Sequence, residues 1–146
     1  MNLRMNNKNL LNGFTLVELL VVLAILALIA GIIGPQVLRQ FNGAKSDTAI
    51  LQIKDLSGSL DLFLLDIGRY PTTEEGLSAL ITQPSGLHSW NGPYLRSSNV
   101  PKDPWGGDYQ YQFDPSGSFE QFRIISLGAD HAPGGSSDNA DISNTQ

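Results

Sequence analysis

The chain has 146 residues and a formal net charge of −5, and this length is enough for one modest domain. The acidic balance argues against nucleic acid as a direct partner, because phosphate binding needs clustered Lys and Arg side chains. The chain has no cysteine. It therefore cannot use disulfides, and a small exported domain without them often needs another stabiliser such as a metal ion.

A nearly unbroken apolar run, Phe14 to Ile33, follows a segment that carries Arg4 and Lys8 and no acid. Twenty helical residues rise about 30 Å, the thickness of the hydrocarbon core of a bilayer. The basic residues before the run place the N-terminus in the cytoplasm by the positive-inside rule. The run is longer than the apolar part of a typical signal peptide and no A-x-A-like site follows it, which disfavours a signal peptide. A plain single-span anchor remains an alternative.

Glu18 is the one charged residue inside this run. An ionised carboxylate in the bilayer costs roughly 2.5 to 3.5 kcal/mol even on lenient insertion scales. A plain anchor does not explain this residue, and the chain offers no Lys or Arg between Lys8 and Arg39 to neutralise it. We therefore expect a cation that reaches the same depth from another molecule.

The basic segment, the hexapeptide G-F-T-L-V-E that ends at Glu18, and the apolar run follow one another in the order seen in type IV pilins and type II secretion pseudopilins. The N-terminus of this chain resembles the signature of that family. The resemblance implies cleavage after Gly13, N-methylation of the new terminus at Phe14, and pairing of Glu18 with the Phe14 amine of a neighbouring subunit. It also matches the family's helix-breaking proline to Pro35. Such a buried pair fixes register, because a slipped register leaves charges unpaired.

A second apolar pattern continues the helix beyond Pro35, where Gly31 and Gly34 also weaken helical structure. The apolar residues recur at spacings of three and four, which marks one helical face. They are Ala49, Ile53, Leu56, Leu60, Phe63 and Ile67. Gly68 fits the position of a C-cap. The pattern predicts one long helix from Phe14 to about Ile67 with a weak point at Pro35.

The remainder predicts a small α+β domain, in which the long helix packs on an antiparallel sheet. Thr72 and Glu75 have the spacing of a capping box before a short helix with apolar Leu77, Leu80 and Ile81. In the Pro- and Gly-rich loop that follows, three aromatic side chains are expected to hold the loop on the core. They are Trp90, Tyr94 and Trp105.

Two strands are predicted at DYQYQF, 108–113, and FRIISL, 122–127, with a turn at 115–118. The stretch DPWGGD, 103–108, is interpreted as a turn before the first strand, with a second acidic site as the alternative. Neither histidine, His88 in a loop or His131 among acids, belongs to a catalytic constellation, and this disfavours a membrane-anchored enzyme.

The stretches GRYPTTEEGL, NGPYL, VPKDPWG and ISLGAD extend the resemblance to the major pseudopilins of type II secretion systems. That family implies a homopolymeric periplasmic filament that drives export of folded proteins across the outer membrane. It implies a leader over 1–13, a transmembrane and assembly helix over 14–34, and a periplasmic domain over 35–146, anchored by one pass in the inner membrane. The implied partners are prepilin peptidase, minor pseudopilins, the inner-membrane platform and the assembly ATPase. A type IV pilin for adhesion, motility or DNA uptake is the alternative, disfavoured by the absence of cysteine.

The segment from Leu127 to Ile142 is Gly-rich and carries Asp130, Asp138 and Asp141 with no basic residue. Three carboxylates repel one another unless a cation lies between them, and calcium accepts six to eight oxygens at irregular geometry. The segment is no EF-hand, and a solvated acidic tail is the alternative from the residues alone. The family resemblance implies calcium here.

Transferred residue by residue, the resemblance gives the three aspartates as calcium ligands, followed by the backbone carbonyls of Leu127 and Ser136. His131 departs from the family, which commonly has glycine at this position.

Overall fold

The computed structural model describes residues 13–116 and 121–145, and divides the chain into two units between residues 39 and 40. One helix, α1 (Leu16–Ile67), is 52 residues long and is the single long helix that the sequence predicts. It is followed by η1 (Leu77–Leu80), β1 (Gln110–Phe113), β2 (Phe122–Ser126), η2 (Gly128–Asp130), η3 (Ser137–Asn139) and β3 (Ile142–Ser143).

The predicted apolar face of α1 forms the core of the second unit. Five of its six side chains are buried, with at most 2% of their surface exposed, and Ile67 is partly buried. The helix ends where Gly68 takes a positive φ of 84° and donates its N–H to the Leu64 carbonyl at 2.7 Å. A residue without a side chain tolerates this left-handed backbone best, so the predicted C-cap is confirmed.

The sheet has the order β1-β2-β3, and both neighbouring pairs are antiparallel. The two predicted strands are confirmed, with Gln110 opposite Ile125 and Phe113 opposite Phe122. The third strand was not predicted, because two residues are too few to show alternation. At the predicted turn, the Asp114 N–H donates to the Gln121 carbonyl at 2.8 Å. Residues 117–120 of that turn lie outside the described residues.

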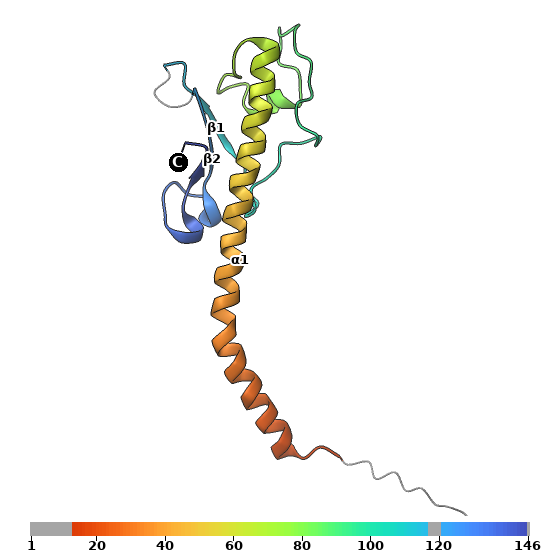
Figure 1. The fold of residues 1–146 in the computed structure, drawn as a ribbon, viewed down its shortest axis with the longest axis vertical. Helices are drawn as coiled ribbons and strands as arrows, with labels where there is room; N and C mark the ends of the chain where they lie inside the picture. The colour runs from red at the N-terminus through yellow and green to blue at the C-terminus, as the bar shows by residue number, and fades with distance from the viewer. Residues whose placement is uncertain (1–12, 117–120, 146) are drawn as a thin grey trace, which may run out of the picture. The chain divides into compact units, whose positions relative to one another are not determined.

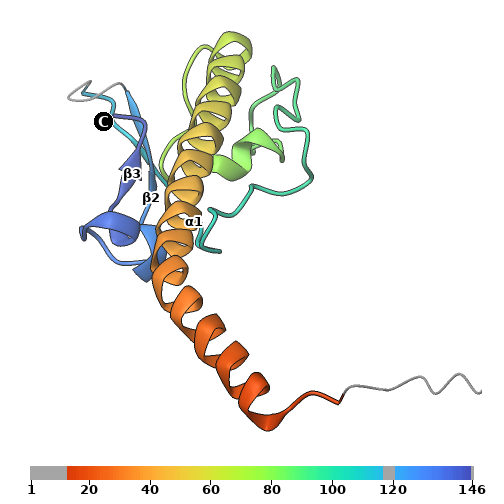
Figure 2. The ribbon, with the colours of Figure 1, turned by 60° about the horizontal axis from the view of Figure 1, so that its bottom comes forward.

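The three strands lie on one side of the outer half of α1, and the loop that follows η1 lies on the other (Figures 1 and 2). Two aromatic side chains hold this loop as predicted. The Trp90 indole donates to the Ala79 carbonyl, and the Tyr94 hydroxyl donates to the Asp66 carboxylate, each at 2.9 Å. Trp105 is half-buried, and its backbone N–H bonds to the Asp103 side chain at 3.1 Å.

Both hydrogen bonds of the predicted capping box, between Thr72 and Glu75, are present. The Glu75 N–H donates to Thr72 Oγ1 at 3.2 Å, and the Thr72 N–H donates to Glu75 Oε2 at 2.8 Å. The helix that it precedes is only the single 3₁₀ turn η1, because Gly76 breaks the helical geometry with a φ of 58°. Leu77 and Leu80 are buried as predicted, and Ile81 is half-buried.

Candidate functional site

The assembly prediction depends on Phe14, which lies two residues before α1, and on Glu18, which lies in its first turn. Thr15 precedes the helix, and its Oγ1 accepts the backbone N–H of Glu18 at 3.2 Å. A threonine cap satisfies a helical N–H that would otherwise have no partner, and a carboxylate in the first turn is favoured by the helix dipole. The sequence signal for this cap is the T-x-x-E spacing of Thr15 and Glu18, which the membrane interpretation of Glu18 overlooks. The Phe14 and Glu18 side chains are exposed.

The apolar side chains in the first half of α1 are exposed in the single chain. Leu16–Val37 is long and apolar enough to cross a membrane, by length and composition, and none of it is buried within the protein. Its Leu, Ile and Val side chains are exposed, from 43% at Val22 to 76% at Leu16. A surface this apolar needs lipid or protein around it.

Pro35 lies inside α1, and the helix is continuous through it. Proline has no backbone N–H, so the Gly31 carbonyl cannot receive its usual helical bond from this residue. The predicted weak point is therefore the missing hydrogen bond from Pro35 to the Gly31 carbonyl and not a break in the helix of the single chain.

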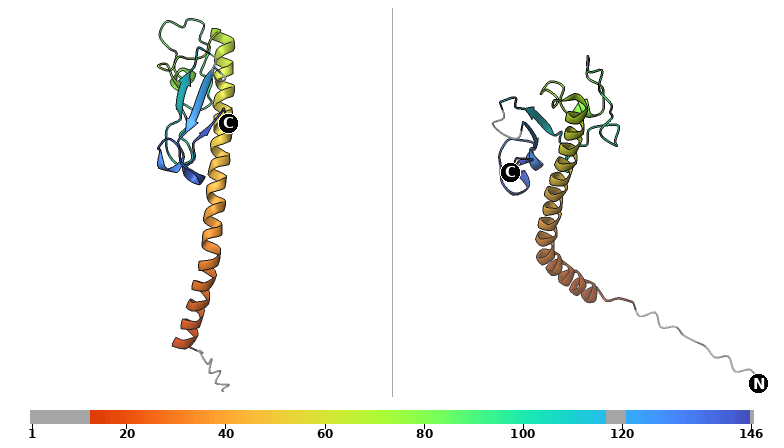
Figure 3. Two further views of the ribbon diagram at one scale, coloured as in Figure 1. Left: turned by 90° about the vertical axis from the view of Figure 1, so that its left-hand side faces the viewer. Right: turned by 45° about the horizontal axis from the view of Figure 1, so that its top comes forward.

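The acidic loop leaves the sheet at one end and returns to it at the same place. Ser126, the last residue of β2, lies opposite Ile142, the first residue of β3. Residues 127–141 therefore form a closed loop at the end of the sheet (Figure 3). Within it, a Cβ placed on Gly128 would lie 2.7 Å from the Asp138 carbonyl oxygen. This contact shows that the two halves of the loop pack backbone to backbone.

The predicted calcium ligands lie on both halves of this loop. Asp130 Oδ1 accepts the Ala132 N–H at 3.1 Å, and Asp141 Oδ2 accepts the Gly134 N–H at 2.9 Å. The Ser136 carbonyl accepts the Asn139 N–H at 3.2 Å. Within residues 13–116 and 121–145, no three His, Cys, Asp or Glu side chains are close enough together to hold a metal. The loop thus brings the segments together but not the three carboxylates.

The chemistry of these donors still fits calcium. All of the candidate ligands are oxygens, and calcium takes backbone carbonyls beside carboxylates, so a site does not need three carboxylates already in contact. Gly134 and Gly135 have φ values of 91° and 93°, which let the backbone turn sharply between the two halves.

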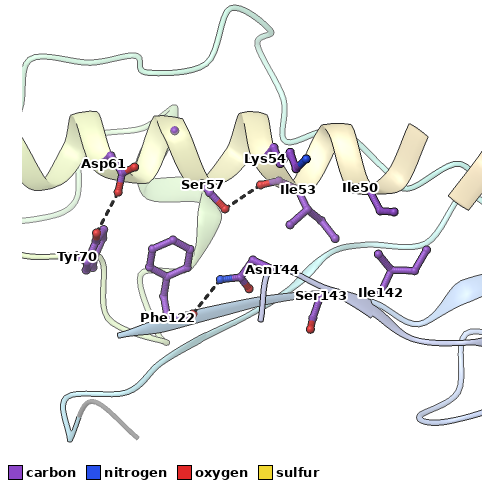
Figure 4. Close-up of a pocket in the computed structure, with 11 residues that line it drawn as sticks. Ile50, Ile53, Lys54, Ser57, Asp61, Tyr70, Phe122, Ile142, Ser143 and Asn144 are labelled. Carbon is purple, nitrogen blue, oxygen red and sulfur yellow. Dashed lines mark hydrogen bonds between the residues drawn. The ribbon is translucent and has the colours of Figure 1, made fainter. Parts of the chain in front are cut away.

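A groove of about 660 Å³ lies between α1 and the C-terminal end of the chain, within the second unit (Figure 4). Its floor is apolar, with Ile53 and Phe122, and Lys54 and Asp61 also line it. The Ser57 hydroxyl donates to the Ile53 carbonyl at 2.8 Å, and Asp61 Oδ1 accepts the Tyr70 hydroxyl at 2.9 Å. The serine is bonded to the backbone, not to a histidine or carboxylate that could activate it.

Comparison with known proteins decides the family. The sequence model of type II secretion system protein G matches residues 36–145, and that of the prokaryotic N-terminal methylation motif matches residues 11–34. The chain belongs to the type II secretion system protein G family. It is 42% identical over 137 residues to the type II secretion system core protein G of Pseudomonas aeruginosa, covering 91% of this chain and 94% of the relative.

Two further proteins of type II secretion systems are similar to this chain. The core protein G of Vibrio cholerae is 41% identical over 135 residues, with 90% of each chain covered. The crystal structure of the major pseudopilin from the type 2 secretion system of enterohaemorrhagic Escherichia coli matches with a TM-score of 0.60 and 35% identity, covering 72% of this chain and 86% of that one. The predicted pilin-like α+β fold is confirmed by this match.

Membership of this family settles two alternatives from the sequence. The chain is a pseudopilin of type II secretion and not a type IV pilin for adhesion or motility. The family is structural, so the membrane-anchored enzyme is also set aside. Its partners are those of a secretion system, and the apolar helix with its methylation motif is consistent with an inner-membrane anchor.

Proposed function

We propose that this pseudopilin polymerises through its N-terminal helix into a periplasmic pseudopilus, which helps to drive folded proteins across the outer membrane. The observation that carries the proposal is the apolar stretch of α1, which buries none of its side chains within the chain and holds a single carboxylate, Glu18. Packing these helices together in a filament removes that apolar surface from water. It also places each Glu18 among other copies.

The processing steps belong to a partner enzyme. Prepilin peptidase cuts after Gly13, which removes a basic leader over 1–13, and methylates the new terminus at Phe14. The segment 14–34 then crosses the inner membrane once, and 35–146 forms the periplasmic domain. Arg4 and Lys8 before the apolar run support this orientation.

Assembly uses the new amine of Phe14 on one subunit and the carboxylate of Glu18 on the next. Each charge alone is costly in a medium without water, and together they neutralise one another. Pro35 and the two glycines before it, Gly31 and Gly34, let the helix extend where subunits pack. Minor pseudopilins, the inner-membrane platform and an assembly ATPase complete the machinery, with the ATPase supplying the work.

Two substitutions of Glu18 separate pairing between subunits from the capping of its own helix. The bond to Thr15 uses the backbone N–H of residue 18, so glutamine keeps this bond while it carries no charge. Glu18→Gln should therefore leave membrane insertion and helix content intact and abolish filaments, as Glu18→Ala should. Electron microscopy of cells that overexpress each variant, with assays of exoprotein release, measures the outcome. Normal filaments from Glu18→Gln would show that the residue serves only its own helix.

We further propose that the acidic loop binds calcium. The ligands are the carboxylates of Asp130, Asp138 and Asp141, with the carbonyls of Leu127 and Ser136. The supporting observations are the backbone contact between Gly128 and Asp138, which brings the two halves together, and the all-oxygen donor set. Bound calcium neutralises the carboxylates and stabilises the loop in a chain that has no disulfide.

Calcium that binds only the folded chain adds about 2.7 kcal/mol to the free energy of unfolding at a hundredfold excess over Kd. A chelator should therefore lower the Tm of the protein, and added calcium should restore it. Asp138→Asn should weaken this response, while Asp47→Asn, outside the loop on α1, should preserve it. A Tm that is identical with chelator and with calcium would overturn the site.

A further inference from the structure

A tight turn precedes β1 and is built around the side chain of Asp103. The turn is closed by the Asp103 N–H, which donates to the Gly107 carbonyl at 2.9 Å. Asp103 Oδ1 accepts two backbone N–H groups, from Trp105 at 3.1 Å and from Gly107 at 2.7 Å. The carboxylate is therefore the centre of the turn that the sequence predicts at DPWGGD. It is also buried, with only 5% of the residue exposed.

The second oxygen of the same carboxylate reaches the acidic loop. Asp103 Oδ2 accepts the Ser126 hydroxyl at 2.6 Å, and the Ser126 side chain is completely buried. Ser126 also lies at the neck of the loop, opposite Ile142, and its Oγ accepts the Gly128 N–H at 3.4 Å. One carboxylate thus connects a turn before β1 with the point where the loop leaves and rejoins the sheet.

A second contact joins the turn to the loop. A Cβ placed on Gly107 would lie 2.7 Å from His131 Nδ1 and 3.0 Å from Asp103 Oδ2. The His131 ring therefore packs against the bare backbone of Gly107, which leaves no room for a side chain there. His131 itself takes a left-handed backbone, with φ of 54°, at the end of η2.

A buried carboxylate is unfavourable unless several donors satisfy it, and Asp103 has three. We propose that Asp103 is a positioning residue for the acidic loop: through Ser126 it holds the neck of residues 127–141 in the arrangement that presents their oxygens to calcium. This inference rests on the calcium binding proposed above. The carboxylate itself binds no calcium, because backbone and hydroxyl donors already surround it.

Three variants of the full chain in detergent micelles test the role. Asp103→Asn removes the charge at the centre of the turn, and Ser126→Ala removes the hydroxyl that joins this carboxylate to the Gly128 N–H of the loop. Asp108→Asn is the matched control, because it makes the same charge change in the same turn at an exposed side chain. Amide hydrogen exchange in chelator measures the order of residues 127–141 without calcium. Calorimetric titration with calcium chloride gives the Kd.

Hydrogen bonds to charged groups are strong enough that losing one should change an equilibrium about tenfold or more. Asp103→Asn and Ser126→Ala should raise exchange in the loop, and raise the calcium Kd, by about this factor. Asp108→Asn should change neither. Exchange in residues 49–63 of α1 is the internal reference, and a rise of equal size there in both variants would indicate general destabilisation and overturn the role.

The two proposals fail differently. A wild-type chain with no calcium affinity would overturn the calcium site and this inference with it. A wild-type chain that binds calcium, with Asp103→Asn and Ser126→Ala binding it equally tightly, would overturn this inference alone.

Discussion

The apolar side chains of α1 differ in their exposure to solvent on the two sides of the division between residues 39 and 40. Over residues 16–37, Leu, Ile and Val are exposed on every side of the helix. After the division, five of the six side chains of one face are buried, and the loops and strands of the same chain cover them. The same residue types therefore have two roles. In the first unit they need contact with lipid or with other protein molecules, and in the second they form the core of a domain.

Substitutions of one residue in each unit should separate these two uses most clearly. Phe63 is completely buried and packs edge-to-face on Tyr94, with ring centroids 5.7 Å apart. Phe63→Ala should lower the free energy of unfolding of the second unit by about 3 to 5 kcal/mol. Leu26 is 56% exposed, and Leu26→Ala should lower the same free energy of unfolding by less than about 0.5 kcal/mol. Urea unfolding followed by tryptophan fluorescence measures both, and equal losses would refute the distinction.

A smaller effect is expected from the ion pair that closes the segment after α1. Arg69 donates to both carboxylate oxygens of Glu75, at 2.7 and 2.8 Å. The hydrogen bond from Arg69 holds the pKa of Glu75 below its ordinary value of 4.5. A depressed carboxylate pKa stabilises the fold above that ordinary value, and the stabilisation is lost as the pH falls through the lower pKa of the folded state.

Glu75→Gln should therefore cost about 1 kcal/mol at pH 7, no more, because the Arg69 side chain is 39% exposed and solvent screens the pair. The difference from the unmodified chain should shrink as the pH falls below 4.5. Glu74→Gln, at the exposed neighbouring residue, is the control and should have little effect at either pH. Parallel urea titrations at pH 7 and pH 3 give the comparison, and a difference that grows in acid would contradict the assigned pair.

The smallest effect is expected at Lys102 and Asp108. Their side chains are 2.7 Å apart but 59% and 85% exposed. Exposed pairs of this kind contribute at most a few tenths of a kcal/mol, because water and salt screen them. Lys102→Met should leave the Tm unchanged within error. A clear drop would mean that the outer edge of this turn matters as much as its buried carboxylate.

The sequence predicted the parts of the fold that depend on short-range patterns. The spacing of three and four residues gave the buried face of α1. The aromatic and β-branched residues of FRIISL gave a strand, in which Phe122, Ile124 and Ser126 are buried. The reciprocal bonds of Thr72 and Glu75 followed from their spacing. The family signature also lay in contiguous motifs, which is why membership could be inferred from the residues alone.

The parts that escaped prediction depend on contacts between distant residues. β3 is a strand only because β2 lies beside it. Asp103 could be placed in a turn, but its burial depends on Ser126, which is 23 residues away. The packing of the loop on itself at Gly128 likewise involves no local pattern. Spacing can predict a face or a cap, but not which remote side chain closes a hydrogen bond.

The exposed first half of α1 restricts how a copy of this chain can pass from lipid into contact with other copies. Leu, Ile and Val side chains each favour the bilayer centre by about 0.3 to 0.6 kcal/mol, so the stretch as a whole gains on the order of 5 kcal/mol from leaving water. A copy that entered solution on its way would forfeit that gain. For the assembly proposed above, lipid tails should therefore be exchanged directly for the helices of other copies at the surface of the membrane, without a dissolved intermediate.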